Sequence, residues 1–156
     1  MAWAIDDRFT KGMIAGTVAG LVLAAENLSS YYLFHFTKRR ALDFASILIY
    51  GHTPHGLWES LFAELAVFVF TAVLGIIFAF LVPGITSKNY LLKGWMFSVF
   101  LWFSIYVIGT LYKTPIISKI DLPTAASNFI STSIFGVVLA YVLRLLDKRT
   151  ERRPAR

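Results

Sequence analysis

LWESLFAELAVFVFTAVLGIIFAFLV, residues 57–82, is the stretch of sequence that decides the fold class. It carries two charges, Glu59 and Glu64, and both lie in its first third. An α-helix rises about 1.5 Å per residue, and the hydrocarbon layer of a bilayer is about 30 Å thick, so roughly 20 apolar residues cross it. The stretch therefore predicts a membrane-spanning helix.

Three further apolar runs of similar length lie at about 13–36, 91–111 and 125–146. Hydrophobic residues make up 57% of the chain and aromatic residues 16%, and the mean hydropathy is +0.66. A water-soluble protein of 156 residues could not cover that much apolar surface. The sequence predicts an all-α protein, an integral membrane four-helix bundle that forms a single domain over residues 1–156.

The segment between the first two spans contains a shorter apolar run at about 41–50. Ten residues are too few to cross a bilayer, and Gly51, Pro54 and Gly56 interrupt the chain after them. A backbone at membrane depth must satisfy its own hydrogen bonds, so the run is expected to be helical. An interfacial helix and a re-entrant helix both fit this pattern.

Positive charge predicts how the four spans are oriented. The N-terminal flank, the second loop and the tail together carry ten of the fifteen Lys and Arg residues, and the first and third loops carry five. Positively charged flanks stay in the cytoplasm, so both termini are predicted to be cytoplasmic. The basic cytoplasmic tail, residues 147–156, is expected to contact anionic lipid headgroups, and no folded basic surface suggests nucleic-acid binding.

Small residues define the faces on which the spans are expected to pack. Gly12, Gly16 and Gly20 form two overlapping G-x-x-x-G units in the first span, and such units let two helix backbones approach closely. Gly75 and Gly136 belong to comparable faces on the second and fourth spans. These three faces are expected to meet centrally, with the aromatic third span more peripheral. Whether the partner of the glycine face lies in the same chain or in a second copy is left open.

Four polar side chains are expected inside the membrane: Glu26, Asn27, Glu64 and Asn128. Ionisable groups there are costly, and they are usually turned inward, paired or neutral. If their helices are neighbours, Glu26 and Glu64 could share a proton or a cation. Alternatively, each is neutral, hydrogen-bonded to an asparagine or a serine, and structural.

His52, His55 and Glu59 form a possible metal site just before the second span. Imidazole and carboxylate groups are ligands for zinc and other divalent ions. The same segment reads as a turn, and histidines in loops are commonly solvated polar residues without a metal. No other cofactor is expected, because the chain has no cysteine and no Walker loop, H-E-x-x-H or Rossmann motif.

Several segments carry a family resemblance: residues 8–16, 75–83, 93–95 and 127–147. Together they resemble small multi-pass membrane proteins of Gram-positive, clostridial-type bacteria that have no assigned function. More loosely, the layout is similar to that of YagU/YqhR-like inner-membrane proteins. The resemblance implies a bacterial cytoplasmic (inner) membrane and implies no catalytic residue.

The leading interpretation is a non-enzymatic structural, accessory or regulatory membrane component. It would self-associate through the glycine face, and another membrane protein is a further possible partner. One alternative is a small oligomeric transporter or channel for protons, cations or a small solute that uses Glu26 and Glu64. Another is a membrane metal-binding protein or metalloenzyme that uses His52, His55 and Glu59.

Overall fold

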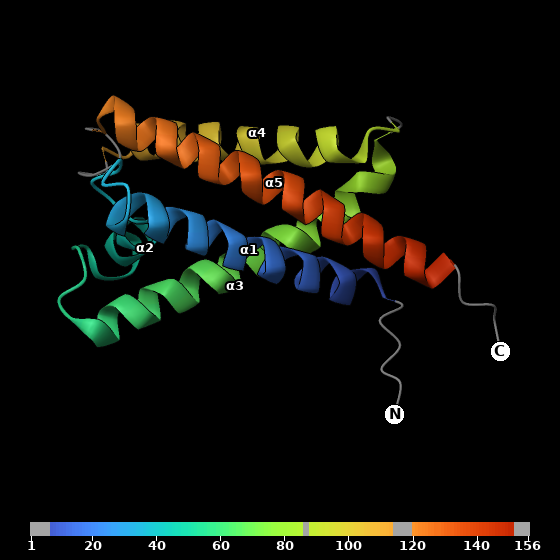
Figure 1. The fold of residues 1–156 in the computed structure, drawn as a ribbon, viewed down its shortest axis with the longest axis horizontal. Coiled ribbons are helices and arrows are strands. Elements are labelled where there is room, and N and C mark those ends of the chain that lie inside the picture. The colour runs from blue at the N-terminus through green and yellow to red at the C-terminus, as the bar shows by residue number, and fades with distance from the viewer. Residues whose placement is uncertain (1–6, 86–87, 114–119, 152–156) are drawn as a thin grey trace.

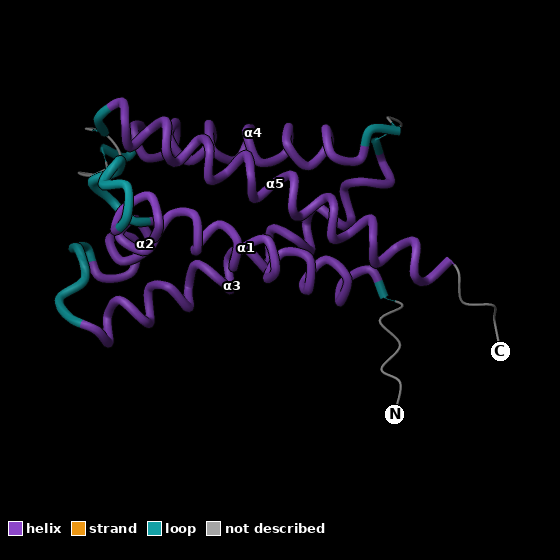
Figure 2. Tube along the Cα trace, viewed as in Figure 1, coloured by secondary structure: helices purple, strands orange, loops and turns teal. Residues whose placement is uncertain are grey.

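Five α-helices and one short 3₁₀ helix make up the part of the chain that the structure, a computed structural model, describes: residues 7–85, 88–113 and 120–151. In order they are α1 (Arg8–Tyr32), α2 (Ala41–Tyr50), α3 (Leu57–Leu81), η1 (Val82–Gly84), α4 (Tyr90–Leu111) and α5 (Leu122–Glu151). The described residues contain no strand (Figures 1 and 2). The predicted all-α membrane bundle is confirmed.

Four of the helices, α1, α3, α4 and α5, are long and apolar enough to cross a membrane, with α3 continuing through η1. Four crossings return the chain to its starting side, and α1 indeed begins at the end of the bundle where α5 finishes (Figure 1). The short α2 lies at the opposite end and packs against α3. It is a helix, as predicted; its depth in the membrane stays a prediction.

The first and last helices begin and end at residues other than those predicted from hydropathy. The first begins at Arg8 rather than near Met13, because Asp7 caps it and accepts a 2.6 Å hydrogen bond from the Thr10 backbone N–H. It ends at Tyr32 rather than near Phe36. The last begins at Leu122 and is longer than its apolar run, since polar turns at both ends continue the helix.

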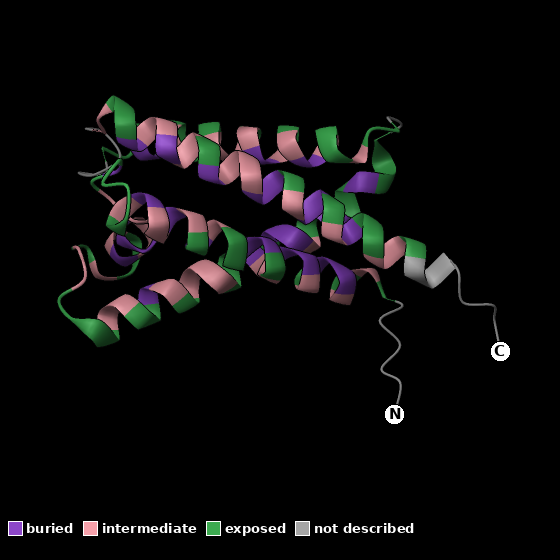
Figure 3. Cartoon of the chain, in the orientation of Figure 1, coloured by how far each residue is buried: buried purple, intermediate pink, exposed green. Residues whose placement is uncertain are grey.

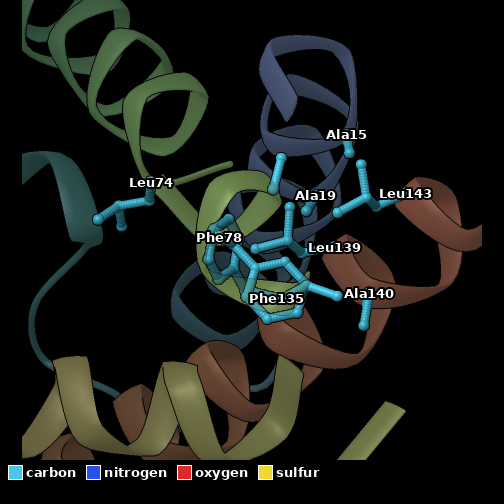
Figure 4. Packing of buried hydrophobic residues seen from close by; sticks show 10 residues of the cluster. Ala15, Ala19, Leu74, Phe78, Phe135, Leu139, Ala140 and Leu143 are labelled. Carbon is cyan, nitrogen blue, oxygen red and sulfur yellow. The ribbon is translucent and has the colours of Figure 1, made fainter. Parts of the chain in front are cut away.

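Helix α1 lies at the centre of the packing and contacts both α3 and α5. Ala15 and Ala19 of α1 meet Phe78 of α3 and Phe135 and Leu139 of α5 in the buried core (Figure 4). The buried residues gather where these helices cross (Figure 3). Large apolar side chains on the outer faces remain exposed in the isolated chain. Lipid is the surrounding in which such faces are stable.

The glycine face of α1 packs against α3 of the same chain. A Cβ atom on Gly12 would lie 2.7 Å from the Gly75 carbonyl oxygen, and one on Gly16 would lie 3.0 Å from the Gly75 Cα. A Cβ on Gly20 would lie 3.0 Å from the Cβ of Thr71. Only glycine allows this approach of the two backbones. The sequence left open whether the glycine face packs within the chain or against a second copy, and in the structure it packs within the chain. A second copy would therefore have to bind at another surface.

Gly136 is a close-packing residue, as predicted, but it packs against α4 rather than at the centre with α1 and α3. A Cβ on Gly136 would lie 2.6 Å from the Cβ of Ser98, and one on Gly94 would lie 2.5 Å from the Cβ of Ala140. These residues join α5 to α4. The third span is therefore lipid-facing on its aromatic sides but close-packed along one edge, because Gly94 and Ser98 leave room there for the α5 backbone.

Candidate functional site

A cavity of about 380 Å³ lies among the membrane-spanning helices. Helices α1 and α3 meet closely at their glycines and diverge toward α2, while α3 has few direct contacts with α4. The cavity that results is lined by residues of all five helices and by Ile120. Most of the lining is apolar, and the side chains from α2, α3 and α4 include Phe44, Leu48, Phe70, Leu101 and Ile105.

Three polar side chains of the lining lie together between α4 and α5. The Asn128 Nδ2 donates a 3.1 Å hydrogen bond to the Tyr106 hydroxyl oxygen. The Trp102 ring lies 4.9 Å from the Tyr106 ring, centroid to centroid. The buried Trp102 Nε1 makes no hydrogen bond of normal geometry with a described residue. The Tyr106 hydroxyl is the polar neighbour with which this N–H interacts, and both residues line the cavity. We call Trp102, Tyr106 and Asn128 the polar corner.

Glu26 and Asn27, two of the predicted intramembrane residues, have protein partners. The Glu26 carboxylate accepts a hydrogen bond from the Ser131 hydroxyl of α5. The Asn27 Oδ1 accepts a 2.6 Å hydrogen bond from the Ala41 backbone N–H, at the start of α2. Asn27 is buried, and its hydrogen bond fixes the short helix beside the cavity. Sequence spacing could not name these partners.

Glu64 is placed differently. Its Oε1 is buried and has no hydrogen-bond partner among the described residues. The positive charge of Arg40, the residue before α2, attracts the Glu64 carboxylate electrostatically. Within the described ranges no hydrogen bond or ion pair connects Glu64 to Glu26. A proton or cation shared by these two carboxyls therefore stays a prediction.

A polar network that the sequence did not predict lies at the end of the bundle where the chain begins. The Lys11 Nζ lies 3.2 Å from the Asp147 Oδ1, and the Tyr90 hydroxyl donates a 2.9 Å hydrogen bond to the Asp147 Oδ2. At the opposite end, the hydroxyls of Ser30 and Ser127 are 3.0 Å apart. The sequence could have indicated the contact between Lys11 and Asp147, because each residue lies within a turn or two of a predicted span end.

The three predicted metal-ligating residues lie together outside the cavity, with both histidines in the turn between α2 and α3 and Glu59 in the first turn of α3. One ligand atom from each of His52, His55 and Glu59 lies within 4.8 Å of the others. The two imidazole rings stack with their centroids 4.5 Å apart. Both histidines are exposed to water. The third histidine, His35, is not part of this group.

A comparison with known proteins gives the family but no activity. Residues 7–153 match the model of a family described as a family of unknown function, DUF6789. No curated protein matches the chain. No solved structure matches it either. With the four apolar helices, these findings describe a multi-pass membrane protein with no assigned function. Because the match covers nearly the whole chain, the protein belongs to this family, DUF6789.

Proposed function

We propose that the protein is a non-enzymatic accessory component of a bacterial cytoplasmic membrane that holds a lipid-like molecule in its cavity. The molecule would have one apolar chain and one small polar group. The observation that carries this proposal is the cavity itself, about 380 Å³ in volume and lined mainly by apolar side chains. Pockets for small molecules are commonly about 300 to 1,000 Å³ and have this mixture of apolar walls and few polar groups.

The position of the cavity supports a ligand that comes from the bilayer. Nearly all of its lining residues belong to the four helices that can cross a membrane, or to α2. Lipid chains are the molecules that surround such helices. An apolar chain would lie along Phe44 and Phe70, while its polar group would reach the polar corner, where the Trp102 N–H makes no hydrogen bond of normal geometry with a described residue.

The lining also supports binding rather than catalysis or ion transport. Its described residues include no Asp, Glu, His, Lys or Arg. General acid–base chemistry needs a titratable group within reach of its substrate, and an ion path needs charged or carbonyl ligands. The amide, hydroxyl and indole groups of the polar corner can orient a molecule by hydrogen bonding. We therefore place the proposed function in recognition of an amphipathic molecule.

The proposal includes an orientation in the membrane. An even number of crossings supports placing both chain ends on the same side. The excess of Lys and Arg at that end supports the cytoplasm as that side. The cavity would then lie in the half of the bundle away from the cytoplasm, because α2, the second half of α1 and the first half of α5 border it. The basic tail would contact anionic headgroups.

The proposal is tested by native mass spectrometry of the protein released from its own membrane in mild detergent. The wild type should keep one bound molecule of lipid-like mass after its loose lipids are removed. Ala66 lines the cavity, so Ala66→Phe should fill it and abolish that adduct. Ala25, an exposed alanine of α1, provides the matched control Ala25→Phe, which should keep the adduct. An equal adduct in both variants would overturn the proposal.

A further inference from the structure

We propose that the turn between α2 and α3 binds a divalent transition-metal ion of the Zn²⁺ class. The ligands are His52, His55 and Glu59. This site is separate from the cavity and independent of the proposed function, since none of the three residues lines the cavity. Two imidazoles and one carboxylate favour zinc and its neighbours in the transition series over Mg²⁺ or Ca²⁺, which prefer oxygen ligands.

The distances suit one small ion. One ligand atom from each side chain lies within 4.8 Å of the other two. Ligand bonds to Zn²⁺ are about 2.0 to 2.2 Å long, so ligand atoms of one ion lie roughly 3 to 4 Å apart. Small rotations of exposed side chains bring the three atoms to these separations.

Hydrogen bonds to the backbone already orient two of the ligands. The His52 Nδ1 donates a 2.8 Å hydrogen bond to the Thr53 carbonyl oxygen, so Nε2 keeps its lone pair. The His55 backbone N–H donates a 2.6 Å hydrogen bond to the Glu59 Oε2, which holds the carboxylate over the turn. Metal-binding histidines commonly donate their second ring N–H to a carbonyl or carboxylate in this way.

Two glycines set the shape of the turn. Gly51 has a φ of 79° and ends α2, and Gly56 has a φ of 103° and precedes α3. Both angles lie in the left-handed region, which side chains other than those of Asn and Asp rarely allow. The turn therefore has defined ends on two helices. Glu59 belongs to the first turn of α3, and His52 and His55 lie between the glycines.

Three protein ligands leave the fourth position of a tetrahedral ion for water. The site is exposed at the first turn of α3, and both of its histidines lie outside the helices that can cross the membrane, so an ion would enter from the aqueous phase. Once bound, it would link the turn to α3 through Glu59. The ion would thus stabilise the end of the bundle that carries α2.

The test is a calorimetric titration of Zn²⁺ into the purified full chain in detergent. Any histidine tag is removed before the titration. We expect saturable binding of one Zn²⁺ per chain and no comparable binding of Mg²⁺. His52→Ala, His55→Ala and Glu59→Gln should each weaken Zn²⁺ binding about tenfold or more, the loss typical even of residues that only support a ligand.

The matched control is His35→Asn. His35 is a histidine at the same end of the bundle, and its φ of 51° is one that asparagine also tolerates. This variant should bind Zn²⁺ like the wild type, and circular dichroism should show that all four variants keep their helix content. Absence of saturable Zn²⁺ binding would overturn the site. So would affinity that is unchanged in the three ligand variants, or lost equally in His35→Asn.

Discussion

The Lys11 ammonium group lies 3.2 Å from the Asp147 carboxylate, and this contact joins the first turn of α1 to the end of α5 across 136 positions of sequence. The Lys11 side chain is only 8% exposed. Asp147 also accepts the hydrogen bond from Tyr90, the first residue of α4. Three helices are therefore held together at the end where the chain begins, opposite the end where α2 borders the cavity.

Asp147→Asn should lower the free energy of unfolding by about 1 to 3 kcal/mol, because the buried Lys11 would lose its counter-charge. Reversible unfolding in mixed micelles, followed by circular dichroism, measures the change. Lys148→Ala, at the exposed neighbouring residue, is the control and should change stability by less than about 0.5 kcal/mol. Equal stability of Asp147→Asn and wild type would show that the ion pair contributes nothing.

Gly16→Ala should destabilise the bundle by about 1 to 3 kcal/mol, because the added Cβ would lie 3.0 Å from the backbone Cα atoms of Ala72 and Gly75. The same substitution at Gly84 is the matched control. A Cβ there meets nothing within 4 Å, and the residue needs no left-handed backbone. Unfolding of both variants in the same micelles gives the comparison. If Gly16→Ala is as stable as Gly84→Ala, the close approach of α1 and α3 is wrong.

Tyr106→Phe should weaken binding of a fluorescent fatty acid about two- to tenfold, because it removes one hydrogen-bonding group of the polar corner. The methyl ester of the same probe has a poorer polar group and should lose less. Tyr112→Phe, at an exposed tyrosine that does not line the cavity, should leave both affinities unchanged. A Tyr106→Phe protein with wild-type affinity would place the polar group of the ligand elsewhere.

Acid should weaken the start of α5. Hydrogen bonds from Thr124 and then from Lys38 hold the pKa of Asp121 below the ordinary value for an aspartate. A lowered pKa in the folded state stabilises the protein above the ordinary pKa, and this contribution is lost as the pH falls below about 4. Asp121→Asn cannot titrate. The stability difference between wild type and Asp121→Asn should therefore shrink as the pH is lowered; a constant difference would contradict the assignment.

Much of the fold followed from the sequence because the bilayer sets the length of a spanning helix. Runs of about 20 apolar residues marked the four spans, and a run of ten was too short to be a fifth. The exact ends did not follow, since capping by Asp7 extends α1 beyond its apolar run. Helix ends depend on single side chains that contribute little to hydropathy.

The neighbours of each helix face were harder to predict. Spacing showed that Gly12, Gly16 and Gly20 share a face, but it could not assign α3 as the partner. It also failed to show that Gly136 turns toward α4. In lipid, contacts depend on local shape rather than on a hydrophobic pattern, because every face is apolar. The cavity results from how the helices cross, so it left no periodic signal in the sequence.

The histidine cluster was easier to predict, because its members are close in sequence. His52, His55 and Glu59 span fewer than ten positions, and Gly51 and Gly56 mark a turn. Local geometry then brings the side chains together. Glu26 and Glu64 are far apart in sequence, so their relative placement depends on how the helices cross. The two side chains have separate surroundings in the structure.

Binding of a lipid-like molecule in the cavity is tested by photo-crosslinking in vesicles. The probe is a fatty acid that carries a diazirine in its chain, and the labelled residues are identified by peptide mass spectrometry. We predict saturable labelling concentrated on the less exposed lining residues such as Phe44, Val67 and Leu101, and unlabelled fatty acid should compete with it. Labelling spread over lipid-facing residues such as Phe80 and Phe100, without saturation or competition, would contradict the claim.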